Sequence, residues 1–292
     1  MTSSPKRLDL GPVRATELIE VESSGKVLIL GGISEAKKLA QQLHDNGIPL
    51  IYSIQGNVRA LEVDYEITSG GFSQYSDSTS SKGCSVSGLG IFLKKNQITL
   101  LVDATHPYAE TMSVNALAST QNINIPYLQY VRPPWSLEEL TASPWPLQIE
   151  ELATYELVLA ETHRYKRPFW AIGYNSLSHL VDKQPAHQTW VFRTAKKTPN
   201  EPLAFFEQDP ANIEIIQEIG PFDIQHETKL FQRKQIDALI CKNSGGNFNE
   251  AKLKAASALD IPVFLLKRPN KIAANCQYSS IETLFNAIIA RI

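Results

Sequence analysis

The sequence has few cysteines, little net charge and no long apolar run, and each shortage excludes a class of protein. Its 292 residues include three cysteines, far apart in the chain, so neither a disulfide framework nor a closely spaced zinc site is predicted. The formal net charge is −2, which rules out a global basic field attracting nucleic acid or anionic lipid. No apolar run approaches the ~20 residues of a membrane-spanning helix, and the N-terminus lacks the apolar core of a signal peptide. We therefore expect a cytoplasmic protein without nucleic-acid or membrane partners.

What is present predicts a globular α/β protein. Hydrophobic residues make up 43% of the chain, which is ample for a buried core. Apolar runs typical of strands alternate with amphipathic stretches typical of helices, so we expect two Rossmann-like doubly wound domains with mostly parallel sheets and a cleft between them. The expected divisions are a flexible leader (1–25), a dinucleotide-binding domain (26–135), a proline-rich linker (136–150) and a second Rossmann-like domain (151–292).

Two local expectations follow from composition and periodicity. Residues 73–87 are rich in Ser and Gly and lack an apolar period, so an exposed loop is predicted there. A helix is predicted around 150–160, after the linker.

The turn after the first predicted strand, 27–30, is the first candidate ligand site. It reads GGISEA, in which glycines let the backbone approach a phosphate and the N–H groups of the following helix favour negative charge. Gly31, Gly32 and Ser34, the expected helix cap, are therefore candidate cofactor ligands. The motif lacks the full GxGxxG pattern and also fits an ordinary tight turn.

The second predicted strand, 50–54, ends without the acidic residue that commonly binds the ribose hydroxyls of NAD. Ser53, Asn57 and Arg59 could accommodate a ribose phosphate instead, or they could form a plain polar loop. The missing acid favours NADPH, with NADH as the alternative.

Two later segments, 100–133 and 238–269, resemble each other. Each contains a strand, a turn, a helix, Ile-Pro, a second strand and Arg-Pro. Such an echo predicts two similar halves whose strand ends, and therefore the turns DATHPYA and KNSGG, face a shared cleft.

The turn DATHPYA places four polar side chains at the carboxyl end of a strand: Asp103, Thr105, His106 and Tyr108. His106 could bind a substrate carboxylate or donate a proton. The alternative is a helix entry capped by Thr105 and Pro107.

The turn KNSGG combines a cation, a hydroxyl and a flexible backbone in Lys242, Asn243, Ser244 and Gly245. These groups suit a diphosphate or a carboxylate, although a simple turn before a helix is the alternative. Lys252, in that helix, is either a ligand or a solvated cation.

The remaining polar motifs are less specific. Gly220 begins a Gly-Pro turn in GPFDIQHE, where Asp223 can cap the next helix and Glu227 can favour its dipole. Five further histidines show no metal-ligand spacing and are interpreted as structural or surface groups: His44, His163, His179, His187 and His226.

The series GGISEA, DATHPYA, IPYLQYVRPPW, GPFDIQHE, KNSGG and IPVFLLKRP, in this order from about Lys26 to the C-terminus, resembles the precorrin-6A reductases, including those that act on cobalt-precorrin-6A. The resemblance implies reduction of one carbon–carbon double bond of a ring-contracted tetrapyrrole by NAD(P)H in cobalamin biosynthesis, without metal or flavin. The alternatives are another NAD(P)H-dependent oxidoreductase and a non-catalytic NADPH-binding sensor. We expect a monomer that contacts neighbouring enzymes of the pathway.

The turn chemistry and the resemblance together give expected roles to individual residues, since the resemblance implies a cofactor that lies between the two domains. The expected cofactor-binding residues are Gly31, Gly32, Ser34, Ser53, Gly56, Arg59, Lys242, Asn243, Ser244 and Gly245. The expected substrate-binding residues are Asp103, Thr105, Arg132, Trp135, Gly220 and Lys252. His106 and Tyr108 are the expected catalytic residues, with solvent as another proton source. Two positions depart from the family, which usually has Thr at Ile33 and often Arg at Asn57, so the cofactor preference is less well defined than the fold.

Overall fold

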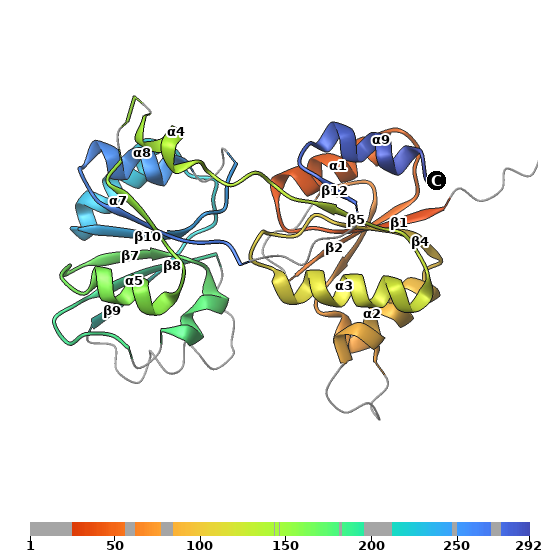
Figure 1. Ribbon diagram of the computed structural model, residues 1–292, viewed down its shortest axis with the longest axis horizontal. Coiled ribbons are helices and arrows are strands. Elements are labelled where there is room, and N and C mark those ends of the chain that lie inside the picture. Colours follow the sequence, from red (N-terminus) through yellow and green to blue (C-terminus); the bar gives the residue numbers. More distant parts are fainter. Residues whose placement is uncertain are drawn as a thin grey trace, which may run out of the picture.

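The chain folds into two α/β lobes that lie side by side (Figure 1). The computed structural model describes residues 25–55, 62–76, 84–142, 144–145, 147–180, 183–195, 212–246, 250–269 and 276–292. Within these ranges the strands form two sheets of six, and all the pairings are parallel. The predicted fold class is confirmed. The expected leader lies outside the described residues, apart from its last residue.

The first lobe follows the chain from β1 to β5. Its elements are β1 (Lys26–Leu30), α1 (Ser34–Asp45), β2 (Leu50–Ile54), β3 (Glu66–Ser69), η1 (Phe72–Tyr75), α2 (Cys84–Lys95), β4 (Ile98–Asp103), α3 (Glu110–Ile123) and β5 (Tyr127–Tyr130). The strand order is β12-β5-β4-β1-β2-β3, so the direction of winding reverses between β1 and β4. Ligands of doubly wound sheets bind at such a switch point, beyond the carboxyl ends of the strands.

The second lobe repeats this topology. Its elements are α4 (Leu137–Thr141), β6 (Ile149–Leu152), α5 (Tyr155–Thr162), β7 (Pro168–Ala171), η2 (Tyr174–His179), β8 (Trp190–Thr194), β9 (Ile213–Gln217), α7 (Ile224–Lys234), β10 (Ala238–Lys242), α8 (Glu250–Ala258) and β11 (Val263–Leu266). The strand order is β6-β11-β10-β7-β8-β9, and the switch point lies between β7 and β10. The internal echo of the sequence thus corresponds to β4-α3-β5 and β10-α8-β11.

The two lobes exchange their sixth strands. β6 follows β5 in sequence but pairs with β11, whereas β12 (Gln277–Tyr278) returns to pair with β5. The last helix, α9 (Ile281–Ile289), then packs beside α1 in the first lobe (Figure 1). This corrects the predicted divisions: residues 149–152 belong to the second sheet, and residues 276–292 belong to the first lobe. A strand therefore belongs to the lobe whose sheet it pairs with, whatever its position along the chain.

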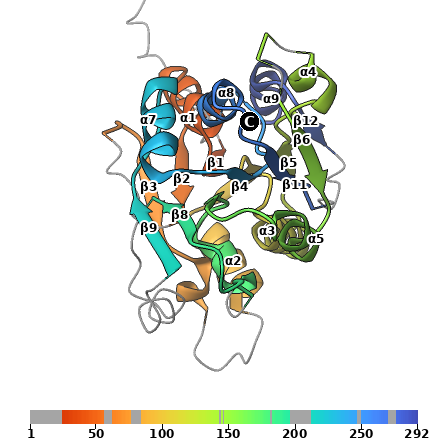
Figure 2. The same ribbon diagram turned by 90° about the vertical axis from the view of Figure 1, so that its left-hand side faces the viewer.

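Each sheet is buried on both faces because alternate strand residues point to opposite helix layers. In the first lobe, α1 and α9 cover the face of Val27 and Ile29, and α2 and α3 cover the face of Leu28. In the second lobe, α7 and α8 lie on one face and α5 on the other (Figure 2). Among the described residues, no helix combines the length and apolarity needed to cross a bilayer.

Some local predictions are wrong because their signals were short. The predicted loop over 73–87 includes part of η1 and the first turn of α2, while residues 77–83 lie outside the described ranges. The predicted helix over 150–160 is the strand β6 followed by α5. Asp223 does cap α7, since its Oδ1 accepts the backbone N–H of His226 at 2.7 Å.

Candidate functional site

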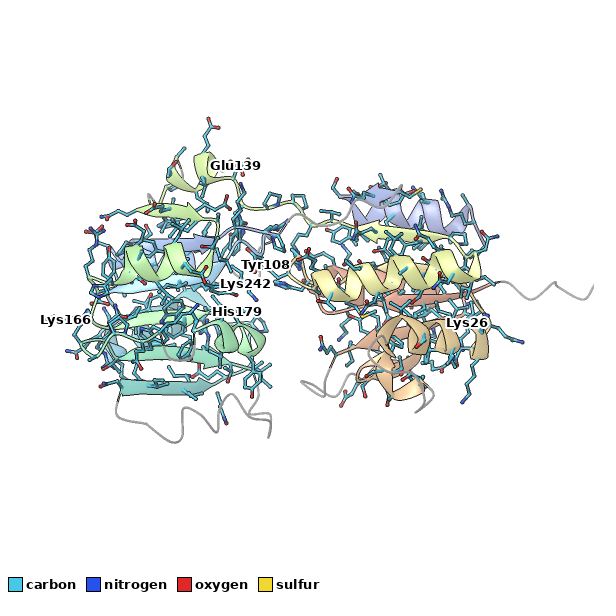
Figure 3. The ribbon with its side chains drawn as sticks, turned by 60° about the horizontal axis from the view of Figure 1, so that its bottom comes forward. Lys26, Tyr108, Glu139, Lys166, His179 and Lys242 are labelled. Carbon is cyan, nitrogen blue, oxygen red and sulfur yellow. The ribbon has the colours of Figure 1, made fainter. Side chains whose placement is uncertain are left out.

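A cavity of about 1590 Å³ lies between the lobes, at the switch points of both sheets. Figure 3 shows Tyr108, Lys242 and His179 where the lobes face each other. The predicted site residues that line this cavity are Gly31, Gly32, Ser34, Ser53, Thr105, His106, Tyr108, Gly220 and Lys242. The expectation that DATHPYA and KNSGG meet at one cavity is confirmed for the first turn and for Lys242 of the second.

The turn after β1 is built around the side chain of Tyr52. A Cβ at Gly31 would lie 2.3 Å from the Tyr52 hydroxyl, so glycine is required there. Gly32 has a φ of +138°, which also favours glycine. Burial raises the pKa of Tyr52 to about 12, although its hydroxyl accepts the Gly32 backbone N–H. The turn therefore places backbone atoms without side chains at the cavity wall.

The start of α1 faces the same cavity. Ile33 precedes the helix and Ser34 is its first residue, so the predicted cap by Ser34 is wrong, and its hydroxyl donates instead to Glu35 at 2.9 Å. Burial opposes ionisation of Glu35, but bonds from Arg132 and Ser34 outweigh it and lower the pKa of this carboxyl. Ile33, the residue before the helix, makes no side-chain cap. Apart from the Glu35 N–H, which the Glu35 carboxylate accepts, the first N–H groups of the helix are available to an anion.

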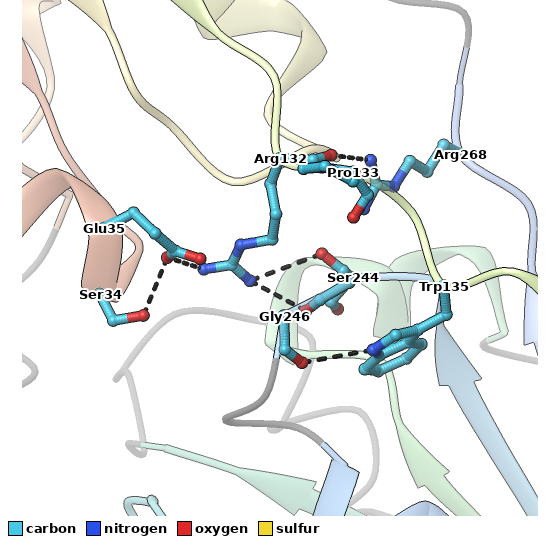
Figure 4. A network of polar contacts seen from close by, with 9 residues as sticks. Ser34, Glu35, Arg132, Pro133, Trp135, Ser244, Gly246 and Arg268 are labelled. Carbon is cyan, nitrogen blue, oxygen red and sulfur yellow. Dashed lines mark hydrogen bonds and ion pairs between the residues drawn. The ribbon is translucent and has the colours of Figure 1, made fainter. Parts of the chain in front are cut away.

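Arg132 joins the two lobes (Figure 4). Its guanidinium donates to the Glu35 carboxylate in the first lobe and to the carbonyl of Gly245 at 3.2 Å in the second. The side chain is only 6% exposed, and its Nε has no hydrogen-bond partner in the described structure. A buried cation that retains a free donor is suited to an anionic ligand.

The rest of the KNSGG turn does not face the cavity but holds residues 133–135, where the chain leaves the first lobe. Asn243 accepts the Trp135 N–H at 2.9 Å and donates to the Trp135 carbonyl at 3.2 Å. A Cβ at Gly245 would lie 2.0 Å from the Pro133 carbonyl. Asn243, Ser244, Gly245 and Trp135 line neither cavity described here. The structure therefore gives these four predicted ligands a structural role.

Asp103 is also structural, because its carboxylate is fully buried beneath the turn after β4. It accepts the backbone N–H and the hydroxyl of Thr105 at 3.0 and 2.7 Å, the Tyr127 hydroxyl at 2.7 Å and the Gln129 amide at 3.2 Å. These bonds fix the loop that carries His106. Asp103 thus positions the site and does not reach the ligand cavity.

His106 and Tyr108 come from the same turn but are engaged differently. The His106 Nδ1 accepts the Tyr108 backbone N–H at 3.3 Å, so the neutral ring carries its proton on Nε2. The Tyr108 hydroxyl donates to the Leu266 carbonyl and accepts the Asn243 N–H at 2.9 Å, and burial raises its pKa. Tyr108 therefore bonds one lobe to the other.

Two further groups line the second-lobe wall. The Lys242 Nζ lies 5.0 Å from the centroid of the Tyr108 ring, and burial lowers the pKa of Lys242 to about 8. Tyr155 and His179 stack with their ring centroids 4.9 Å apart. Interpreting His179 as a structural or surface residue missed its place at the cavity.

A side chamber of about 370 Å³ adjoins the main cavity and shares Gly32, Ser34, His106 and Gly220 with it. In its wall, Arg193 forms two 2.8 Å bonds to the buried carboxylate of Glu227. Burial lowers the pKa of the nearby Lys252.

The wall of this side chamber is positively charged and keeps unused donors. The charged side chains that line the chamber are Arg132, Arg193, Lys252, Glu218 and Glu227, which together carry one net positive charge when all are ionised. The Thr194 hydroxyl is buried without a hydrogen-bond partner in the described structure, as is the Arg132 Nε. These groups can bind a carboxylate or a phosphate.

Several of these residues were missed in the sequence for identifiable reasons. Arg193 is a charged residue within an apolar strand, and this was the signal that could have identified it. Its partner Glu227 lies 34 residues away and was interpreted only as favouring the dipole of its own helix. Tyr52 resembles an ordinary core residue of a strand. Gly56 and Arg59 lie outside the described residues.

Two six-stranded parallel sheets with facing switch points and a cavity between them define a two-lobed α/β protein with Rossmann-like halves. Residues 26–289 match the family described as precorrin-6x reductase CbiJ/CobK, and the chain belongs to this family.

Relatives and a solved structure agree with this membership. The chain is 30% identical over 246 residues to a precorrin-6A reductase of Mycobacterium tuberculosis, covering 84% of this chain and 89% of that protein. It is 29% identical over 184 residues to a cobalt-precorrin-6A reductase of Synechocystis, covering 62% and 67%. The solved structure of CobK precorrin-6A reductase has a TM-score of 0.74 and 27% identity, covering 91% of this chain and 97% of that one.

Proposed function

We propose that this protein reduces one carbon–carbon double bond of precorrin-6A with a reduced nicotinamide cofactor, as a step of cobalamin biosynthesis. Family membership supports the reaction, and the observation that carries it here is the shared cavity of about 1590 Å³. Pockets for one drug-sized ligand span roughly 300–1000 Å³, so this cavity has room for a cofactor and a macrocycle together. The protein's main contribution is to orient the two and exclude water.

The first lobe supplies the proposed cofactor site. Gly31, Gly32 and Ser34 would hold the diphosphate at the uncapped start of α1, with Ser53 beside the ribose. In the second lobe the corresponding strand, β7, is followed by Gly173 and the short helix η2, which offers no comparable helix start. When bound, the cofactor supplies a hydride.

Both lobes contribute to the proposed substrate site. Precursors of the corrin ring carry many carboxylates, and the side chamber offers Arg132, Arg193 and Lys252 to one of them. His106 stands between the two cavities, where its Nε2–H can donate a hydrogen bond to the substrate. Thr105 and Gly220 complete the wall.

We also propose the metal-free substrate and NADPH. Relatives named for precorrin-6A are 30–32% identical to this chain over 83–84% of it, whereas cobalt-precorrin-6A reductases that cover 90% of it are 24–25% identical. The end of β2 carries Ser53, Ile54 and Gln55 rather than an acid that would repel a 2′-phosphate. Tighter binding of NADH than NADPH would overturn the cofactor preference, and Arg59→Ala at two salt concentrations tests the expected phosphate contact.

The activity is tested by anaerobic incubation with precorrin-6A and with its cobalt form, following oxidation of NADPH and NADH separately. Substrate-dependent oxidation is expected, and it should be faster with the metal-free form. Binding of NADPH without oxidation in the presence of either substrate would replace the reductase with a sensor.

Gly31→Ala tests the cofactor site. The new Cβ would collide with Tyr52, so we expect the turn to shift and NADPH affinity to fall about 10- to 100-fold, corresponding to roughly 1–3 kcal/mol of overpacking. Gly90→Ala is the matched control, because a Cβ at Gly90 meets no atom within 4 Å. Equal NADPH dissociation constants in Gly31→Ala and the parent would move the cofactor elsewhere.

A further inference from the structure

Reducing a carbon–carbon double bond adds a proton as well as a hydride, so the cavity needs a proton donor. This inference rests on the proposed function and concerns which side chain supplies that proton. The sequence suggested His106, Tyr108 or solvent, and the structure changes this choice.

Tyr108 and His106 are poorly arranged to release a proton. The Tyr108 hydroxyl is committed to the Leu266 carbonyl, and its proton would have to leave a bond that joins the two lobes. The His106 Nδ1 accepts the backbone N–H of Tyr108, so one of its two ring nitrogens is already engaged in holding its own turn. Both residues are therefore better suited to positioning.

Lys242 differs from the other cations of the cavity. It is the last residue of β10, it lines the cavity and its Nζ faces the Tyr108 ring at 5.0 Å. Within the described residues its ammonium has no ion pair or hydrogen bond. Lys37 and Lys267 also line the cavity without such a partner but are exposed, and Arg268 donates to the carbonyls of Asn243 and Pro133. A half-buried ammonium without a carboxylate partner keeps all its N–H groups for a ligand.

The charged groups around Lys242 come from every element that surrounds it. Tyr108 follows β4, Arg268 follows β11, Glu151 lies on β6, and α5 and η2 contribute Tyr155, Glu156 and His179. The Glu151 carboxylate accepts the Asn243 amide at 2.9 Å, and the Glu156 carboxylate pairs with Lys183 at 3.1 Å. Neither carboxylate neutralises Lys242.

We propose that Lys242 is the proton donor of the reduction. An ammonium N–H bond breaks and its proton forms a C–H bond at one carbon of the double bond, while the hydride of the reduced nicotinamide forms a C–H bond at the other. The substrate gains two electrons, the nicotinamide loses two, and Lys242 is left as a neutral amine that takes a proton from water before the next turnover.

The acidity of Lys242 fits this role. Burial lowers its pKa to about 8, so the ammonium persists at neutral pH and yet releases a proton more readily than an ordinary lysine. Because the proton is available only below this pKa, which is that of the protein before substrate binds, kcat/KM should fall as the pH rises through about 8.

Lys242→Arg separates proton donation from simple charge, because arginine keeps the positive charge but does not deprotonate near neutral pH. We expect kcat to fall about 10²- to 10⁴-fold, the usual contribution of a positioned acid, while KM for the substrate stays within about threefold. Lys242→Met should lose kcat similarly. Lys166→Met, at an exposed lysine that lines neither cavity, is the matched control and should retain the parent kcat.

The dissociation constant of NADPH, measured by cofactor fluorescence, shows whether each variant remains folded and competent to bind. Retained kcat in Lys242→Arg with an unchanged fall of kcat/KM near pH 8, or a raised KM with unchanged kcat, would overturn the proposal in favour of anion binding.

Competitive acylation of the amine across pH, read by peptide mass spectrometry, measures the acidity of Lys242 without any turnover. Half-maximal labelling near pH 8 is expected, and labelling only above about pH 10 would contradict the proposal. If the parent protein itself oxidises no NADPH, the proposed function fails and the donor role fails with it. Turnover by the parent and by Lys242→Arg alike defeats the donor role alone.

Discussion

Asp103 and Lys242 hold equivalent positions in the two lobes. Each is the last residue of the strand beside the central strand, and each pairs with the next strand outward, at Gln129 and Leu266. Asp103 is fully buried and accepts four hydrogen bonds within its own lobe. Among the described residues, the Lys242 ammonium has no ion pair or hydrogen bond and faces the Tyr108 ring. At this strand position the buried Asp103 stabilises the first lobe through its hydrogen bonds. In the second lobe the same position holds the Lys242 ammonium without an ionic partner, which lowers the stability of the fold.

Asp103→Ala should produce the largest effect and the clearest test of this contrast. Removing the carboxylate leaves buried donors of Thr105, Tyr127 and Gln129 without an acceptor, so we expect a loss of about 3–5 kcal/mol in the free energy of unfolding. Urea denaturation measures it, with Asp103→Asn as the conservative control that should lose less. A loss below about 1 kcal/mol would show that the network does not hold the first lobe.

Arg132→Met tests a second difference between the lobes. The Arg132 side chain fills the turn after β10, whereas the turn after β4 opens to the cavity. We expect a loss of about 2 kcal/mol, because Glu35 and the carbonyl of Gly245 lose a buried partner. The control Lys183→Met breaks an exposed ion pair and should change little. Equal unfolding midpoints of the two variants in urea would reduce the Arg132 contact to an ordinary surface pair.

Lys242→Met should act with the opposite sign to Asp103→Ala and stabilise the fold by about 1 kcal/mol at pH 7, because an unpaired ammonium is no longer desolvated. The folded-state pKa of about 8 lies below the ordinary value of 10.5. The penalty is therefore full below pH 8 and is relieved as the pH rises towards 10.5. Urea denaturation at pH 7 and pH 10 should show the gain shrinking, and destabilisation at pH 7 would indicate a hidden partner of Lys242.

Glu35→Gln should have the smallest effect at neutral pH and a distinct pH dependence. The bonds from Arg132 and Ser34 lower the pKa of Glu35 below 4.5, so its contribution is present above pH 4.5 and is lost as the pH falls through the lower folded value. The parent should lose its advantage over the variant in acid, as followed by thermal unfolding from pH 7 to pH 3. Parallel curves over this range would show that ionised Glu35 adds nothing to the contact between the lobes.

The sequence predicted best where the signal was local. The apolar run before Gly31, the glycines and the amphipathic helix predicted β1, its turn and α1, because strand and helix periods are properties of short segments. The internal echo placed His106 and Lys242 at one cavity, since both lie at carboxyl ends of strands and similar halves were expected to face each other across a cleft at these ends. The exchanged strand β12 has only two residues and carried no such pattern.

The predicted ligand residues of one turn differ in whether they reach the cavity, and the reason lies in distant contacts. Lys242 and Asn243 are adjacent in a turn whose composition suits an anion, but only Lys242 reaches the cavity, because Asn243 is used by Trp135 and Glu151. A polar turn has the same composition whether it binds a ligand or holds another segment of the chain, so composition does not distinguish the two.

The sequence by itself therefore determined the α/β class, the two similar halves and the turns that carry polar groups, because periodicity and turn chemistry act over a few residues. Only the tertiary structure decided which lobe each end strand joins and which polar groups are satisfied. The deciding partners lie far along the chain, as Arg132 does from Gly245, 113 residues away, and Tyr108 from Leu266, 158 residues away. A side chain becomes available to a ligand only when folding brings it no partner, as with Lys242 and not Asp103.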